Sequence, residues 1–170
     1  MIESPNPVRR ALRESAGRVA TDADYEHFGL RPGVPTLLVF GGSGGASTLN
    51  RAVAEAWPRL RDETAWQVLL QTGERDLEGT RAVVNRAQDD TLRARVLSYI
   101  DDMAAAYRVA DLVVCRAGAL TLTELATVGK PAVLVPFPHA TDDHQRRNAQ
   151  VLVERGAARA VDDADFDGER

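Results

Sequence analysis

The stretch Arg116–Asn148 reads RAGALTLTELATVGKPAVLVPFPHATDDHQRRN and decides the predicted fold. A turn that contains Gly118 opens a helical segment, an apolar run follows as a strand, and a polar helix then begins. In an α/β protein both helix starts lie beside one strand, at the end of the sheet where such proteins bind ligands. Together with the glycine-rich turn at 41–45, this pattern predicts a site for a ligand that carries phosphate and ribose.

Outward from this stretch, strand-like and helix-like segments alternate from Pro35 onward. We expect strands at 36–40, 66–71, 95–100, 112–115, 132–137 and 158–161, and helices at 46–60, 75–88, 103–110, 120–128 and 144–155. This alternation predicts an α/β fold with a parallel sheet, right-handed crossovers and helices on both faces. Residues 1–33 are expected to form an interdomain linker with one short helix at 8–15. Residues 34–170 form the expected domain, which ends within an incomplete helix at 165–170.

Composition narrows the class of protein. The 170 residues are 44% hydrophobic and 27% charged, as in an ordinary globular domain, and the net charge of -4 argues against a nucleic-acid surface. The single cysteine, Cys115, excludes an internal disulfide, and its apolar surroundings indicate a buried strand residue. No apolar run reaches the length of a membrane-spanning helix and the N-terminus is polar, so we expect a cytoplasmic chain.

The turn Gly41–Gly45 (GGSGG) follows one expected strand and precedes a helix. Four glycines in five positions let the backbone approach a ligand, and the freed N–H groups and helix dipole attract phosphate. The turn lacks the Gly-Lys-Ser/Thr ending of a P-loop and the strict G-x-G-x-x-G spacing. A plain strand-to-helix turn is the alternative.

Two further segments also have two interpretations each. Thr121 and Glu124 have capping-box spacing, but a carboxylate such as Glu124 can also accept hydrogen bonds from both hydroxyls of a ribose. Asp101 or Asp102 can cap the next helix, or the backbone of Ile100 can face the edge of a planar base.

The segment from Pro138 to Asn148 likewise fits either a solvated helix start or a sugar site. Thr141 is a candidate N-cap, whereas Gln145 and Asn148 lie three residues apart on one face and can bind sugar hydroxyls. His139 and His144 do not have a recognised metal-ligand spacing, so we expect no metal.

Five strings in this order resemble the C-terminal domain of the MurG family of N-acetylglucosaminyltransferases. They are NPVR (6–9), GGSGGA (41–46), YIDDMAAAY (99–107), DLVVCRAGALTLTE (111–124) and VPFPHATDDHQRRNA (135–149). The resemblance covers nearly the whole chain, from Asn6 to about Val161. It implies a Rossmann-like domain, the C-terminal half of a GT-B glycosyltransferase, which holds the donor UDP-N-acetylglucosamine.

The resemblance also implies which residues contact the donor. Arg9 would lie near the nucleotide, Ser43 with Gly42 and Gly44 would bind the diphosphate, and the backbone of Ile100 would meet the uracil. The phosphate and sugar would lie against Ala119, Leu120, Thr121, Leu122, Thr123 and Glu124, with Glu124 on the ribose. Gln145, helped by Asn148, would bind the N-acetylglucosamine hydroxyls. His144 departs from the glutamine that some members carry there.

The implied reaction moves N-acetylglucosamine, with inversion, to a lipid-linked muramoyl pentapeptide in peptidoglycan synthesis. The family's N-terminal domain, which carries the acceptor site and the proposed base, has no counterpart in this sequence. We therefore expect no catalytic residue, metal or cofactor here, and contact with the lipid only through that domain, on the cytoplasmic face of the membrane. Two alternatives stay open: another GT-B nucleotide-sugar enzyme, such as a glycolipid glycosyltransferase or an epimerase, and a non-catalytic nucleotide-binding module.

Overall fold

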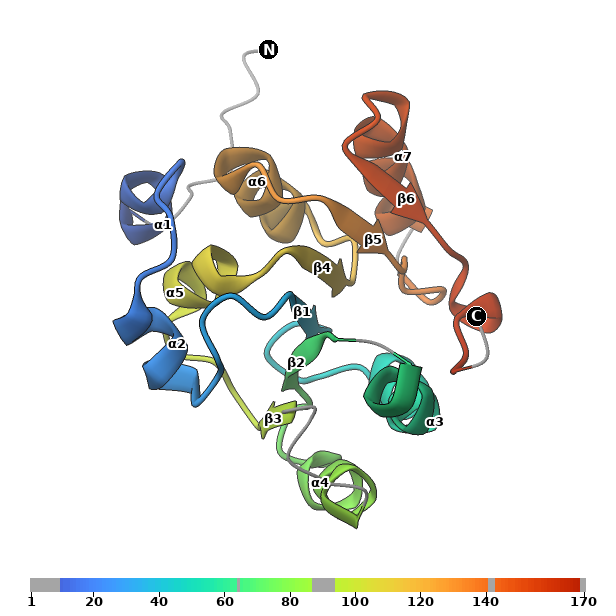
Figure 1. Cartoon of the computed structure of the whole chain (residues 1–170). Helices are drawn as coiled ribbons and strands as arrows, with labels where there is room; N and C mark the ends of the chain where they lie inside the picture. The colour runs from blue at the N-terminus through green and yellow to red at the C-terminus, as the bar shows by residue number, and fades with distance from the viewer. Residues whose placement is uncertain (1–9, 64, 87–93, 141–142, 169–170) are drawn as a thin grey trace.

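The computed structural model describes residues 10–63, 65–86, 94–140 and 143–168 (Figure 1). All strand pairs in the sheet are parallel, and the strand order is β3-β2-β1-β4-β5-β6. The strands are β1 (Thr36–Phe40), β2 (Gln67–Gln71), β3 (Ala94–Leu97), β4 (Leu112–Cys115), β5 (Ala132–Leu134) and β6 (Ala158–Ala160). This order confirms the predicted Rossmann-like fold and puts the reversal of strand order between β1 and β4.

Helices cover both faces of the sheet, as the alternating pattern predicted (Figure 1). They are α1 (Arg10–Ser15), α2 (Asp22–Phe28), α3 (Ser47–Glu63), α4 (Leu77–Arg86), α5 (Met103–Val109), α6 (Ala119–Val128) and α7 (His144–Glu154). Because strand side chains alternate, Leu38 and Phe40 belong to one core cluster, with α5, α6 and α7, and Val39 belongs to the other, with α3. Burial on both faces explains why the strands are apolar runs.

The N-terminal segment differs from the expected linker. The sequence predicted one short helix there, and the structure adds α2, which begins with a capping box between Thr21 and Asp24. Phe28 lies in the same buried cluster as the strands, and Arg108 of α5 pairs with Asp24 at 2.5 Å. The described part of this segment therefore packs on the domain, while the domain boundary itself stays a prediction.

Several element ends also differ from prediction, most clearly those of β3, β5 and the last segment. β3 ends at Leu97 and β5 at Leu134, so the residues that follow form loops at the ends of the strands rather than longer strands. In place of the helix expected from 165, a single 3-10 turn, η2, spans Asp163–Asp165. Phe166 then packs against the cluster that contains Val39, which draws the chain back onto the sheet.

Candidate functional site

A polar cavity of about 580 Å³ lies at the carboxyl edge of the sheet, the edge at which the parallel strands end. Ligands of open α/β sheets bind at this edge, beside the reversal of strand order. The walls come from the turn after β1, the start of α3, and the loops after β4 and β5. The lining residues are Gly41, Gly45, Ala46, Ser47, Thr48, Arg75, Arg116, Phe137, Pro138, His139, Gln145 and Asp163.

The two ends of the glycine turn, Gly41 and Gly45, line this cavity, whereas Gly42, Ser43 and Gly44 are exposed and lie outside its lining. Gly42 and Gly45 have positive φ values of 94° and 74°, and the Gly45 N–H donates to the Gly42 carbonyl at 3.0 Å. A Cβ on Gly45 would overlap the carbonyl oxygen of Thr72, so packing alone requires that glycine. Gly44 has neither a positive φ nor a close neighbour. The free protein therefore gives no reason for glycine at 44, which leaves room for the ligand interpretation.

The start of α3 brings a polar cluster to the same wall. Ser47 Oγ donates to Asp76 Oδ2 at 2.8 Å, and Asn50 Nδ2 donates to the same oxygen at 2.9 Å. These hydrogen bonds, that from Ser47 above all, lower the pKa of Asp76. Arg75 also contacts Ser47 Oγ through its guanidinium and is 78% exposed, which places a solvated positive charge beside the glycine turn.

The capping-box interpretation of Glu124 is wrong. The N-cap of α6 is Gly118, which makes no side-chain cap, and Thr121 already lies inside the helix. Glu124 is instead buried, with 7% of its surface exposed, and accepts a hydrogen bond from the hydroxyl of Tyr107 at 3.2 Å. Burial, followed by the charge of Glu124, raises the pKa of Tyr107, so that hydroxyl stays protonated and donates.

The other residues at the start of α6 that were predicted to contact the ligand differ in their exposure to solvent. Ala119 and Leu120 are exposed, and Thr121 and Thr123 are half-buried. Leu122 packs in the core, and its backbone N–H already donates to the Gly118 carbonyl at 3.0 Å. None of the residues 119–124 lines the polar cavity, which means that the structure places this segment beside the cavity's wall and not in it.

Gln145 and Asn148 both join α7 to the loop after β4. Gln145 Oε1 accepts hydrogen bonds from the backbone N–H of Ala117 at 3.1 Å and of Phe137 at 3.0 Å. Asn148 Nδ2 donates to the Ala117 carbonyl at 3.3 Å. The Nε2 group of Gln145 donates to no group in the described residues, and Gln145 lines the cavity. This amide can therefore hold the loops through its oxygen and offer its N–H groups to a ligand.

The helix start before Gln145 differs from prediction. The N-cap of α7 is Asp143, in a left-handed conformation with φ of 53° and no side-chain cap. The predicted N-cap, Thr141, is therefore wrong for α7, and Thr141 itself falls outside the described residues. Arg9 also falls outside them.

Ile100 has one backbone group already engaged. Its N–H donates to Gln71 Oε1 at 2.9 Å, so only its carbonyl is available to the edge of a base. Asp102 caps α5, with Oδ1 accepting from the Ala105 N–H at 2.9 Å, which confirms the capping interpretation for that aspartate.

Arg116 and Asp163 form a buried ion pair that the sequence interpretation missed. Arg116 is 8% exposed, its Nη1 donates to the carbonyls of Val135 at 3.1 Å and Pro136 at 3.3 Å, and its guanidinium lies 5.4 Å from the Phe137 ring centre. The signal available in the sequence was the position of Arg116, directly after strand β4. Asp163 neutralises this charge, so Arg116 holds loops together in the free protein.

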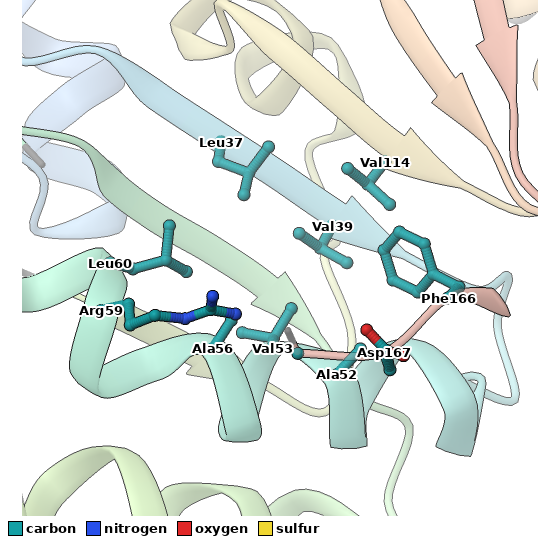
Figure 2. Close-up of a pocket in the computed structure, with 11 residues that line it drawn as sticks. Leu37, Val39, Ala52, Val53, Ala56, Arg59, Leu60, Val114, Phe166 and Asp167 are labelled. Atoms are coloured by element: carbon teal, nitrogen blue, oxygen red, sulfur yellow. The ribbon is translucent and has the colours of Figure 1, made fainter. Parts of the chain in front are cut away.

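A second cavity, of about 320 Å³, differs in kind. It lies between α3 and the face of the sheet, where Val39, Val114 and Phe166 gather (Figure 2). Its lining is mostly aliphatic and contains none of the predicted site residues, so it is not the expected donor site. Within the described ranges there is no group of three or more His, Cys, Asp or Glu side chains suited to a metal, and no helix long and apolar enough to cross a membrane.

Comparisons with known proteins agree with this geometry. Residues 36–170 match the glycosyltransferase family 28 C-terminal domain. Relatives from Geobacter metallireducens and Chlorobium limicola are 48% and 49% identical over 96% of this chain, and both carry the name UDP-N-acetylglucosamine--N-acetylmuramyl-(pentapeptide) pyrophosphoryl-undecaprenol N-acetylglucosamine transferase. The chain spans only 43% and 42% of their lengths.

A solved structure gives the same result. The crystal structure of Acinetobacter baumannii MurG is 40% identical, with a TM-score of 0.74 over 86% of this chain and 41% of that protein. The predicted resemblance is thereby confirmed, as is the fold of the C-terminal half of a GT-B glycosyltransferase. The chain belongs to glycosyltransferase family 28 and contains its C-terminal domain.

Proposed function

We propose that this chain is the donor-binding domain of an inverting transferase that moves N-acetylglucosamine from UDP to lipid-linked muramoyl pentapeptide. One observation carries the proposal: the polar cavity lies beside the glycine turn at the carboxyl edge, in a chain 48% identical to a relative named for this transfer. The acceptor, the catalytic base and contact with the membrane would belong to the part of the relatives that this chain does not match.

The diphosphate would bind at the glycine turn and the first turn of α3. Backbone N–H groups at Gly42, Ser43 and Gly44, together with the helix dipole, would stabilise the negative charge of the leaving UDP. Arg75 lies on the same wall and pairs with Asp76 at 3.2 Å, but its side chain is 78% exposed, so its guanidinium can turn to the diphosphate. Arg116 adds little, because Asp163 already pairs with it.

The uridine and the sugar would lie on either side of that diphosphate. The Ile100 carbonyl can accept a hydrogen bond from N3–H of uracil, and Glu124 can accept from the ribose hydroxyls. Gln145 would donate its Nε2 hydrogens to the hydroxyls of N-acetylglucosamine, while its oxygen holds the two loops. Positioning the donor is thus this domain's share of catalysis.

A donor panel tests this function. In calorimetric titrations the chain should bind UDP and UDP-N-acetylglucosamine, more weakly UDP-glucose, and should transfer no sugar to a lipid acceptor by itself. Preference for a different sugar would favour another nucleotide-sugar enzyme. A complete lack of UDP-sugar binding would favour a non-catalytic module and overturn the proposal.

A further inference from the structure

A buried glutamine connects two parts of the carboxyl edge that are far apart in the sequence. Gln71 is the last residue of β2 and is 3% exposed. Its Nε2 donates to the Gly42 carbonyl at 2.8 Å, and its Oε1 accepts from the Ile100 N–H at 2.9 Å. One side chain therefore spans from the glycine turn to the segment that follows β3.

The bond to Ile100 is buried, and the bond to Gly42 is partly buried at an exposed residue of the turn. The Gly42 carbonyl also accepts from the Gly45 N–H, so the bond from Gln71 holds a turn that is already closed. Beyond Gln71 the chain continues the ladder with β3, because the Thr72 N–H donates to the Leu97 carbonyl at 2.9 Å. A buried amide with both ends paired fixes the relative position of its partners.

We propose that Gln71 is a positioning residue, which holds the phosphate-binding and base-binding segments at the separation that a nucleoside diphosphate requires. This inference rests on the proposed function, in which the glycine turn binds the diphosphate and Ile100 the base. UDP is then a bivalent ligand for two half-sites, and its affinity depends on their fixed spacing. Uridine and pyrophosphate each occupy one half-site and depend on it far less.

Glutamine is specific for this role because it presents one donor and one acceptor. In Gln71→Glu the carboxylate can still accept from Ile100, but it faces the Gly42 carbonyl as a second acceptor and the bond to the turn is lost. Gln71→Met keeps the length of the side chain, loses both bonds and introduces no buried charge. Gln71→Met therefore tests the inference if Gln71→Glu does not fold.

Gln67 provides a matched control on the same strand. It is also a glutamine, 1% exposed, with Oε1 accepting from the Arg31 N–H and Nε2 donating to Thr36 Oγ1, each at 2.9 Å. It begins β2, so it lies at the opposite edge of the sheet from the glycine turn. Gln67 Nε2 also donates to the carbonyls of Arg31 at 2.9 Å and Val34 at 3.1 Å, so Gln67→Glu and Gln67→Met should disturb the fold at least as much as the Gln71 variants do, without reaching the proposed site.

The experiment measures binding of UDP, uridine and pyrophosphate by calorimetry and by shifts of backbone amide resonances. The Gln71 variants should lose at least about tenfold in UDP affinity, while uridine and pyrophosphate each stay within about threefold. The Gln67 variants should keep UDP affinity within about twofold, although their loss of melting temperature should be at least as large as that of the Gln71 variants. Unchanged UDP binding in the Gln71 variants, or equal losses for all three ligands, would overturn the inference alone. An unaltered chain that binds no UDP would overturn the proposed function as well.

Discussion

Replacing Glu124 by glutamine tests the ribose contact with the smallest change in shape. The carboxylate can accept from two ribose hydroxyls, whereas the amide keeps one acceptor oxygen and turns the other position into a donor. One hydrogen bond to a charged group is lost, which costs about 1.5–3 kcal/mol of binding free energy. That loss corresponds to a decrease of about ten- to a hundredfold in UDP affinity.

The structure indicates that stability should change much less than binding. Gly118, not Thr121, begins α6, so Glu124 is not a cap that the substitution could remove. The remaining amide oxygen can still accept from the Tyr107 hydroxyl, which now lies 3.2 Å from Glu124 Oε2. The variant also no longer buries a charge. We therefore expect a melting temperature close to that of the unaltered chain.

Calorimetry with UDP and 2′-deoxy-UDP completes the assay. Glu124→Gln should bind UDP far more weakly, while the two proteins should differ much less for 2′-deoxy-UDP, which offers only one of the two hydroxyls. Equal losses for both ligands, or normal UDP binding, would refute the ribose contact. Tyr107→Phe is the companion variant, because it removes the hydroxyl that holds Glu124 and leaves the carboxylate in place. It should lower stability by about 1–3 kcal/mol and UDP affinity by less than Glu124→Gln does.

Three further predictions concern stability and reactivity. Gly45→Ala forces an overlap and a positive φ, so chemical denaturation should show a loss of at least about 2 kcal/mol, whereas Gly44→Ala should stay within about 0.5 kcal/mol; equal effects would contradict this. The hydrogen bond from Arg108 holds the pKa of Asp24 well below its usual value, so its stabilisation is complete above about pH 4 and is lost in stronger acid. Urea titrations from pH 7 to about 2 should show Asp24→Asn less stable at neutral pH, with the difference from the unaltered chain narrowing steadily below about pH 4. Burial raises the pKa of the Cys115 thiol, so a disulfide reagent at pH 8 should label it only after unfolding, and rapid native labelling would disprove its burial.

The fold was predictable because its signal is local and repeated. The runs at Thr36–Phe40 and Leu112–Cys115 were predicted with the bounds that the structure shows, since strands buried on both faces are continuous apolar segments. Helix α2 was missed although Thr21 and Asp24 have the spacing of a capping box, because Pro5, Pro7 and Pro32 made the sequence of residues 1–33 typical of a linker. The short ends of β3 and β5 were missed because apolar residues continue past the point where the ladder stops.

The structure has a polar cavity at the edge of the sheet where the sequence predicted the site, but the side-chain contacts there were predicted only in part. Gln145 was singled out because it begins a polar helix after a strand, and the structure brings it to the cavity beside the glycine turn. Its oxygen, however, is taken by two backbone N–H groups, which no spacing in the sequence indicates. Glu124 was given a capping alternative because spacing alone cannot locate the first residue of a helix. The Tyr107 hydroxyl, which donates to Glu124 in the structure, lies on another helix.

Three residues were missed by the sequence interpretation for the same physical reason. Gln71, Arg116 and Tyr107 are all nearly fully buried, and each makes its polar contacts with a segment at least 17 residues away in the sequence. Such contacts depend on which strands become neighbours, and the order β3-β2-β1-β4-β5-β6 is set by crossovers rather than by any local string. The proposed ligand-facing residues lie largely in loops and helix starts whose glycines and polar residues are visible in the sequence. The side chains that fix the distances between those loops lie at the ends of strands and look like ordinary core residues. A donor site of this kind is therefore specified at two levels, and only the first can be recognised before the sheet is assembled.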